Sequence, residues 1–229
     1  MDRRHVTHFY PCKDKATFST RRRLTLSRMV RLDPAAEVVL DFIRALCHHT
    51  LVAHNRFVDD GSRVNFLGAR LRDVPARRRE EFDDWIGGLF DSLRDRASGG
   101  KPHVVTLALD RDGAVETAID FSFRVKTERD GGESAAAAAA ASARDALGTL
   151  AARFVVALDD EISRARTREG GKIGYDITCV GPEGSEPPSG WRVDETSIDV
   201  PGGERVSIGK GACETDAIEV DISMLVRRR

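Results

Sequence analysis

Two clusters of histidine and cysteine carry the donor atoms most suited to chemistry: His5, His8 and Cys12 in the first, and Cys47, His48, His49 and His54 in the second. A structural zinc site takes four such ligands, often with a Cys-x-x-Cys or His-Glu-x-x-His spacing. Neither spacing occurs here, and adjacent helical residues such as His48 and His49 point about 100° apart. We therefore predict no metal and no other cofactor, and interpret His48 and His49 as residues at the boundary of a helix's apolar face.

Two pairs of carboxylates, Asp59-Asp60 and Asp83-Asp84, are the remaining candidates for acid-base chemistry. Gly61 follows the first pair, which is typical of a turn, and the second pair falls on the polar face of a helical pattern. The sequence has no phosphate-cradling glycine loop, nucleophile elbow or dinucleotide-binding fingerprint. These patterns predict a protein that is not an enzyme and has no catalytic residue.

The composition is that of a chain with one substantial apolar core. The chain has 229 residues, of which 41% are apolar, and no run of 18 apolar residues that would span a membrane. The N-terminus has no apolar signal region, so we expect a soluble intracellular protein. The four cysteines, at positions 12, 47, 179 and 213, are widely spread, which favours free thiols over disulfides.

Positive charge is concentrated in residues 1–32, which hold nine Lys or Arg against two Asp in a chain whose formal net charge is -1. We expect a basic N-terminal arm over these residues. A solvated tail is the simplest interpretation, and contact with DNA phosphates or a nuclear import signal are the alternatives. The candidate contact residues of the arm are Arg3, Arg4, Arg21, Arg22 and Arg23.

Three segments have the apolar periodicity of amphipathic helices. The first begins at Asp33-Pro34, a plausible N-cap and first-turn pair, and runs to about Asn55. The second carries an apolar stripe from Phe82 to Leu93 and ends at residues 98–100, which read Ser-Gly-Gly. The third is the longest, beginning near Ser134 and ending before residues 170–171, which are both glycine.

Strand patterns follow the second and third helices. Residues 103–109 and 115–126 alternate around an Asp-Gly turn and predict a hairpin. Residues 172–180 alternate with Ile173, Tyr175, Ile177 and Cys179 on one face and with Gly174, Asp176 and Thr178 on a face that we expect to be solvated.

The C-terminal part of the chain also has strand patterns. A segment rich in Pro and Gly, residues 181–190, leads to Trp191, which we expect to bury its ring and anchor this excursion. Residues 196–200 and 205–208 flank a turn, and residues 217–225 form a last strand whose apolar face includes Ile218, Val220 and Ile222. Antiparallel strands with helices on one face predict an α+β domain.

In their order, these segments resemble the HORMA domain, over roughly residues 34–225. After its first helix the family often carries an aromatic-x-Arg-Gly-hydrophobic-aromatic-Pro run. Residues 55–60, Asn-Arg-Phe-Val-Asp-Asp, stand in the place of this run, although its Gly and Pro are missing here. The stripe from Trp85 to Leu93 and the following hairpin are most similar to the meiotic chromosome-axis branch. The strand at residues 174–180 and the segments at 187–191 and 204–225 look like the last core strand and the C-terminal "safety belt".

The resemblance implies a HORMA-like α+β fold with three helices packed on a mostly antiparallel sheet. Its domain would span residues 33–229, with a core at about 33–180 and the safety belt at about 181–226. It implies an adaptor that threads a closure-motif peptide, from a partner protein or another copy of the chain, under the belt. The peptide would pair with a strand edge. The peptide-binding residues would be Ile173, Tyr175, Ile177, Cys179, Trp191, Ile218, Val220 and Ile222.

The resemblance also implies open and closed belt arrangements, with an AAA+ ATPase remodeller that reopens the closed one by engaging the N-terminal segment. A role in meiotic chromosome-axis assembly or checkpoint signalling would place a eukaryotic protein in the nucleus, on chromosomes. Three alternatives stay open at this point. One is a nucleic-acid-binding protein that uses the basic arm, and another is a bacterial-type regulator of a defence nucleotidyltransferase. The third is a metal-dependent hydrolase that uses the histidines.

Overall fold

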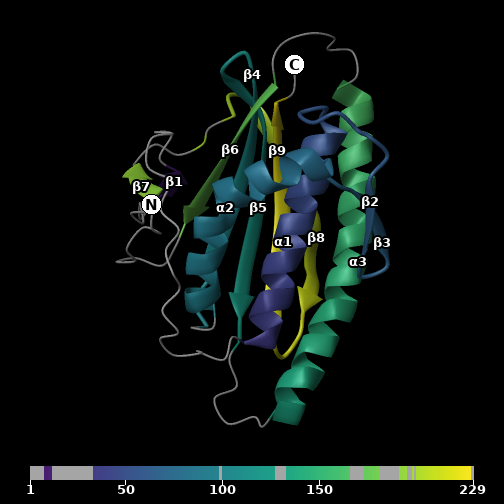
Figure 1. Ribbon diagram of the computed structural model, residues 1–229, viewed down its shortest axis with the longest axis vertical. Coiled ribbons are helices and arrows are strands. Elements are labelled where there is room, and N and C mark those ends of the chain that lie inside the picture. The colour runs from purple at the N-terminus through teal and green to yellow at the C-terminus, as the bar shows by residue number, and fades with distance from the viewer. Residues whose placement is uncertain are drawn as a thin grey trace.

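Three helices lie together on one face of an antiparallel sheet in the computed structural model, which describes residues 8–11, 33–97, 100–126, 133–165, 173–180, 191–194, 198 and 200–227 (Figure 1). Within these residues the helices are α1 (Pro34–Ala53), α2 (Ala76–Ala97) and α3 (Glu133–Ala165). The prediction of an α+β fold with three helices on an antiparallel sheet is confirmed. None of the helices within the described ranges has a stretch apolar enough to cross a membrane.

Helix α1 starts where the sequence predicts, because Asp33 caps it. The Asp33 carboxylate accepts a hydrogen bond from the Ala35 backbone N–H at 2.9 Å, and Pro34 fills the first helical position, where no donor is needed. The predicted apolar stripe is fully buried at Val39, Phe42 and Ile43. Burial extends around most of the helix, since α2, α3 and the segment at residues 69–72 also pack against it.

A left-handed residue ends α1 and fixes the direction of the chain beyond it. Asn55 has φ 58°, a conformation that Asn tolerates better than most residues with a side chain. Its N–H donates to the Val52 carbonyl at 3.0 Å, and the Arg56 N–H donates to the Leu51 carbonyl at 2.8 Å. These two bonds define a Schellman motif. The turn therefore forms without the Gly of the HORMA-type run, because Asn55 supplies the positive φ.

The main sheet has seven strands in the order β7-β1-β6-β4-β5-β9-β8, and every recorded pairing is antiparallel. The bounds of the strands are β1 His8–Pro11, β4 His103–Arg111, β5 Ala114–Val125, β6 Ile173–Val180, β7 Trp191–Asp194, β8 Gly203–Glu214 and β9 Ile218–Arg227. The predicted β4–β5 hairpin is confirmed, and Asp112 and Gly113 both take the positive φ of its turn, at 52° and 84°.

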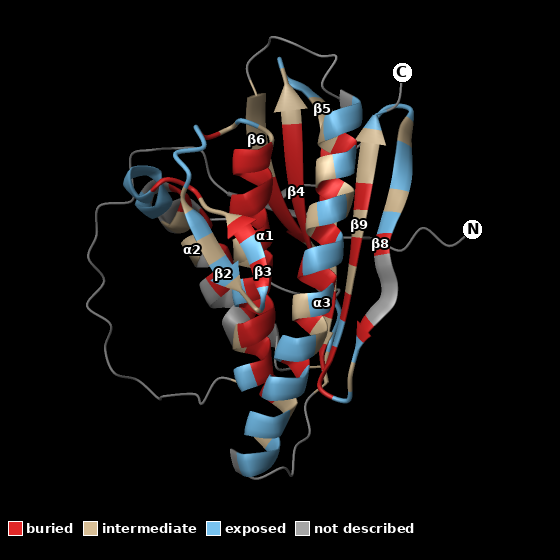
Figure 2. Ribbon diagram, turned by 90° about the vertical axis from the view of Figure 1, so that its right-hand side faces the viewer, coloured by how far each residue is buried: buried red, intermediate tan, exposed pale blue. Residues whose placement is uncertain are grey.

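The core fills the space between the helices and the facing side of the sheet. In register, Ile177 of β6 lies beside Leu107 of β4, which lies beside Ile119 of β5, and Met224 of β9 follows. All four of these side chains are fully buried. Buried residues accordingly cover most of α1 and the strands beneath it, while α3 turns an exposed face to solvent (Figure 2).

A second hairpin, which the sequence analysis did not predict, packs on the helices. It consists of β2 (Arg63–Phe66) and β3 (Ala69–Arg72), joined by Leu67 and Gly68 with φ of 51° and 84°. A leucine at positive φ gives no turn signal in a sequence, because side chains with a Cβ disfavour that conformation. The hairpin lies against α1 and α3.

Three other expectations differ from the structure. His48 and His49 are buried, with exposed fractions of 6% and 2%, and do not lie at a boundary. Thr178 was expected on a solvated face but is only 1% exposed. Residues 8–11, assigned to the basic arm, form β1 within the main sheet. All three are tertiary effects, because they depend on which segments pack together and not on the local pattern.

Candidate functional site

The edge of β6 away from β4 is the part of the sheet where the predicted peptide-binding residues lie. Strand β1 pairs with β6 at the far end only, where His8 is opposite Val180 and Phe9 is opposite Cys179. On its other edge, β1 pairs with β7 along its whole length, from His8 opposite Asp194 to Pro11 opposite Trp191. Among the described residues, the pairs between β1 and β6 end at Cys179, and no described strand lies beside residues 173–178 on this edge, where a further strand could add.

Side chains on the helix-facing side of β6 become more accessible toward Ile173. Ile177 is fully buried and Cys179 is 2% exposed, whereas Ile173 and Tyr175 are half-buried. The structure thus places the four predicted β6 residues, Ile173, Tyr175, Ile177 and Cys179, along one strand and one face. Of these, Ile173 and Tyr175 retain apolar surface that a pairing peptide would cover.

An aromatic cluster surrounds Tyr175. The Tyr175 ring centroid lies 6.1 Å from that of Phe57, which follows α1, and 6.1 Å from that of Phe82 of α2. The Arg56 guanidinium carbon lies 5.0 Å from the Tyr175 ring centroid and 5.5 Å from the Phe57 ring centroid. Both distances are in the range of cation–π contacts. Sequence reasoning did not nominate Arg56, Phe57 or Phe82 for this site, although residues 55–57 stand in the run quoted for the HORMA resemblance.

Contacts of His48 with two carboxylates hold α2 in the position that brings Phe82 to Tyr175. His48 of α1 places Nδ1 2.8 Å from Asp73 Oδ1 and Nε2 3.5 Å from Asp83 Oδ1. Asp73 also pairs with Arg79 of α2. The His48 ring meets the Phe82 ring edge-on, with centroids 4.8 Å apart. The expectation that Asp83 lies on a purely solvated face is therefore wrong, because its carboxylate faces His48.

The environment of Asp83 favours its charged form. Burial acts to raise the pKa of the Asp83 carboxyl, but the interaction with His48 and the charges of Arg44 and Arg79 outweigh it and hold the pKa below its ordinary value. The cluster links α1 to α2 through charges on both helices. Since charged partners that share burial are costly to separate, the cluster holds α2 in position against α1.

Two other histidines are kept neutral by their surroundings. Burial lowers the pKa of His49 to about 4, and the charge of Arg72 adds to the effect. Burial likewise lowers the pKa of His54 to about 4, and the charge of Arg111 is the second cause of this decrease. The Nδ1 atom of neutral His49 accepts a hydrogen bond from the Arg72 backbone N–H at 2.9 Å. This bond ties α1 to β3 and is structural.

The remaining predicted site residues lie elsewhere. Ile218, Val220 and Ile222 are buried on β9, which pairs with β5 and β8, so β4 and β5 separate them from β6. Trp191 opens β7, where its backbone is opposite Pro11, and its side chain lies outside what the structure describes. Arg3, Arg4, Arg21, Arg22 and Arg23 lie outside the described residues. The structure therefore brings the β6 set together and does not bring the β9 set to it.

The histidines, cysteines and carboxylates do not gather into a metal site within the described ranges. No group of three or more of these side chains there has the arrangement that could hold an ion. Cys47, Cys179 and Cys213 are buried, and burial raises the pKa of the Cys47 thiol to about 12. Asp59 and Asp60 accept hydrogen bonds from the backbone N–H groups of Gly61 and Ser62, which confirms that this pair belongs to a turn.

Comparison with solved structures identifies the fold. A chain of the mitotic checkpoint complex superposes with a TM-score of 0.62 at 12% identity, over 85% of this chain and 99% of the other. HTP-2 bound to HTP-3 motif-6 superposes with a TM-score of 0.56 at 14% identity, over 86% and 93%. C. elegans HTP-1 bound to the HIM-3 closure motif superposes with a TM-score of 0.53 at 12% identity, over 85% and 92%. Models of protein families and curated proteins give no match to the sequence.

These neighbours are HORMA-domain proteins, and the match extends over nearly all of each neighbour's chain. The protein therefore has the HORMA fold, as the order of its sequence segments predicts. At this level of identity the likeness establishes the architecture, and the activity is argued below from the site.

Proposed function

We propose that the protein is a non-enzymatic adaptor that captures short peptides by pairing them with the outer edge of β6. The observation that carries this proposal is the geometry of that edge, where β1 lies beside Cys179 and Val180 but not beside the half-buried Ile173 and Tyr175. An extended peptide gains backbone hydrogen bonds from a strand edge and selectivity from the side chains on its faces.

Two further observations support the proposal. The solved HTP-1 and HTP-2 structures that share the fold are complexes with closure motifs of other proteins. In addition, the buried His48 and His49 of α1 are engaged in structural contacts, as are Asp73 and Asp83, whose carboxylates face His48. We propose closure-motif peptides as the partner class, from another protein or from a second copy of the chain, and chromosome-axis assembly or checkpoint signalling in the nucleus as the setting.

Only the last strands of the belt would require a rearrangement, because β7, which falls within the predicted belt at residues 181–226, lies on the β6 side of the sheet next to β1. Strands β8 and β9 lie at the β5 edge, on the opposite side of the sheet from the β6 edge (Figure 1). We propose that this hairpin leaves β5 to cover a peptide on β6. Strand β1 ties the N-terminal segment to β6, which supports the further proposal that an AAA+ remodeller pulling on the N-terminus would disturb the peptide site.

The test is a selection of random peptides on the purified full-length protein, followed by hydrogen exchange on a selected complex. The expected result is a set of related sequences and slower exchange of amides in residues 173–178 when the peptide is bound. The β2–β3 hairpin serves as an internal control, because it lies on the helices and its exchange is expected to stay unchanged. Failure to select any related peptides, or protection confined to another part of the chain, would contradict the proposed function.

A further inference from the structure

We infer that Arg56 selects an acidic side chain in the peptide that pairs with β6, at the position beside Tyr175. This inference rests on the proposed function, because it specifies the chemistry of the peptide that the same edge takes. It starts from the position of Arg56, which the Schellman motif after α1 holds over the Tyr175 and Phe57 rings.

Arg56 makes its contacts with rings and not with carboxylates. Its Nε atom is buried without a hydrogen-bond partner, and none of the ion pairs between described residues includes it. Nearby acids are used by other arginines. Arg63 Nη1 and Nη2 donate to the two oxygens of Asp59 at 2.7 and 3.0 Å, and Arg111 Nε donates to Glu116 at 3.0 Å. Among the described residues, therefore, no carboxylate is paired with the positive charge of Arg56.

The position of Arg56 places this charge within reach of a paired peptide. Directly opposite residues on neighbouring strands have their Cβ atoms about 4.5–5.5 Å apart and on the same face of the sheet. A peptide residue opposite Tyr175 would therefore lie beside the ring over which the guanidinium sits, 5.0 Å from its centroid. Arginine binds a carboxylate through two parallel N–H donors, so an Asp or Glu at this position satisfies donors that the rings cannot.

The rings of Tyr175 and Phe57 make an ion pair between Arg56 and an acidic peptide side chain stronger than an ion pair fully exposed to water. Tyr175, Phe57 and Arg56 itself are buried or half-buried, so the local environment screens charge less than bulk solvent does. The rings also restrict the arginine side chain before the peptide arrives, which lowers the entropy cost of binding. A neutral residue at the same position would cover the guanidinium without satisfying it, and such a peptide is disfavoured.

The experiment compares selected peptides from one random library on three forms of the full-length chain: the natural protein, Arg56→Glu and the control Arg153→Glu. Arg153 is exposed on α3. Peptides selected on the natural protein and on the control are expected to share one acidic position. Peptides selected on Arg56→Glu are expected to have Lys or Arg at that position instead. Replacing that acid by its amide in a selected peptide should weaken binding to the natural protein by about tenfold.

Arg56→Gln is a second variant that removes the charge without reversing it, and thermal melting of every variant detects a folding defect. The replacement of the acid in the peptide is measured on the natural protein and needs no variant. Related peptides without a shared acidic position would overturn the inference while leaving the proposed function intact. An acidic preference that persists unchanged in folded Arg56→Glu or Arg56→Gln would also overturn it. Selection of no related peptides by the natural protein would overturn both the inference and the proposed function.

Discussion

His49 illustrates how one buried side chain makes stability depend on pH. Its pKa is about 4 in the folded protein, against an ordinary value of 6.5, because burial disfavours the imidazolium. Between these two values the unfolded chain binds more protons than the folded one. The contribution of His49 to the free energy of unfolding is therefore fully present above pH 6.5, and it is lost as the pH drops toward 4.

We predict that His49→Asn flattens this acid-side slope. Asn keeps an acceptor for the Arg72 N–H but does not titrate, so the loss of stability attributable to His49, about 3 kcal/mol at most, should disappear. Urea unfolding of both proteins at pH 7.5 and pH 4.5 measures the difference. Comparison at pH 7.5 isolates any packing cost of the substitution. An identical acid-side loss in the variant would show that His49 does not drive it, and His54, which has a similar pKa, would be the next candidate.

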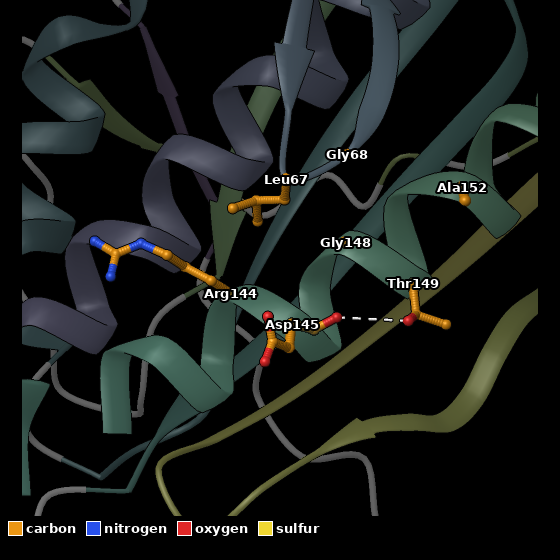
Figure 3. A pocket seen from close by; sticks show the side chains of 7 residues that line it. All are labelled: Leu67, Gly68, Arg144, Asp145, Gly148, Thr149 and Ala152. Atoms are coloured by element: carbon orange, nitrogen blue, oxygen red, sulfur yellow. Dashed lines mark hydrogen bonds between the residues drawn. The ribbon is translucent and has the colours of Figure 1, made fainter. Parts of the chain in front are cut away.

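At the scale of elements, the β2–β3 hairpin and α3 approach each other most closely at Gly148. A Cβ atom added at Gly148 would lie 2.4 Å from the Leu67 carbonyl oxygen, which is backbone and cannot move aside alone. Figure 3 shows Leu67 and Gly68 of the turn facing this part of α3, where a shallow pocket also touches Arg144 and Asp145. The absence of a side chain at Gly148 thus determines how near the hairpin can lie.

We predict that Gly148→Ala destabilises the domain by about 1–3 kcal/mol, since the overlap must be relieved by moving the turn. Ala is otherwise better than Gly inside a helix by about 1 kcal/mol, so the sign of the change tests the contact. Gly87→Ala in α2 is the matched control, because its added Cβ would meet nothing within 4 Å, and we expect it to stabilise. The denaturant midpoints of the two variants and of the natural protein measure the sign of each change in stability. An equal increase in stability from both substitutions would rule out a steric role for Gly148.

At the scale of the whole molecule, the order of the strands determines how the C-terminal hairpin can act. Strand β9 is an interior strand between β5 and β8, and its Ile218, Ile222 and Met224 are fully buried. Removing it would expose the core, so truncation does not separate belt action from folding. A lock that keeps β9 in place is the better test, because it leaves the core intact.

We predict that a disulfide between β5 and β9 shortens the lifetime of bound peptide. Ser122 and Asp221 are directly opposite in the register, and the adjacent Phe121 and Phe123 point toward the helices, so Ser122→Cys with Asp221→Cys places two thiols on the other face of the sheet. If the hairpin must leave β5 to cover the peptide, the oxidised protein should release a fluorescent peptide faster than the natural chain. Reduction should restore slow release. Each single cysteine variant serves as a control, and equal release from the oxidised and reduced forms would mean that the hairpin does not move.

Local signals in the sequence determined the helices and the central hairpin. Asp33 and Pro34 fix the start of α1, the apolar stripes identify the buried helix faces, and the Asp112-Gly113 pair supplies the turn between β4 and β5. The alternating β6 strand was also predicted, with Ile173 and Tyr175 on the face that the structure gives them. These features depend on residues a few positions apart, and so the sequence alone carries them.

Only the tertiary structure decided the strand order and the surroundings of Tyr175. A strand's alternation gives its faces but not its neighbours, so nothing local placed β1 beside β6 or β9 beside β5. Leu67 gives no turn signal in the sequence, because a leucine rarely takes a positive φ. It takes this conformation where the turn packs against Gly148 of α3, which is a long-range contact. Arg56 reaches Tyr175 across more than a hundred residues of chain, and its role follows from that contact, which only long-range packing creates.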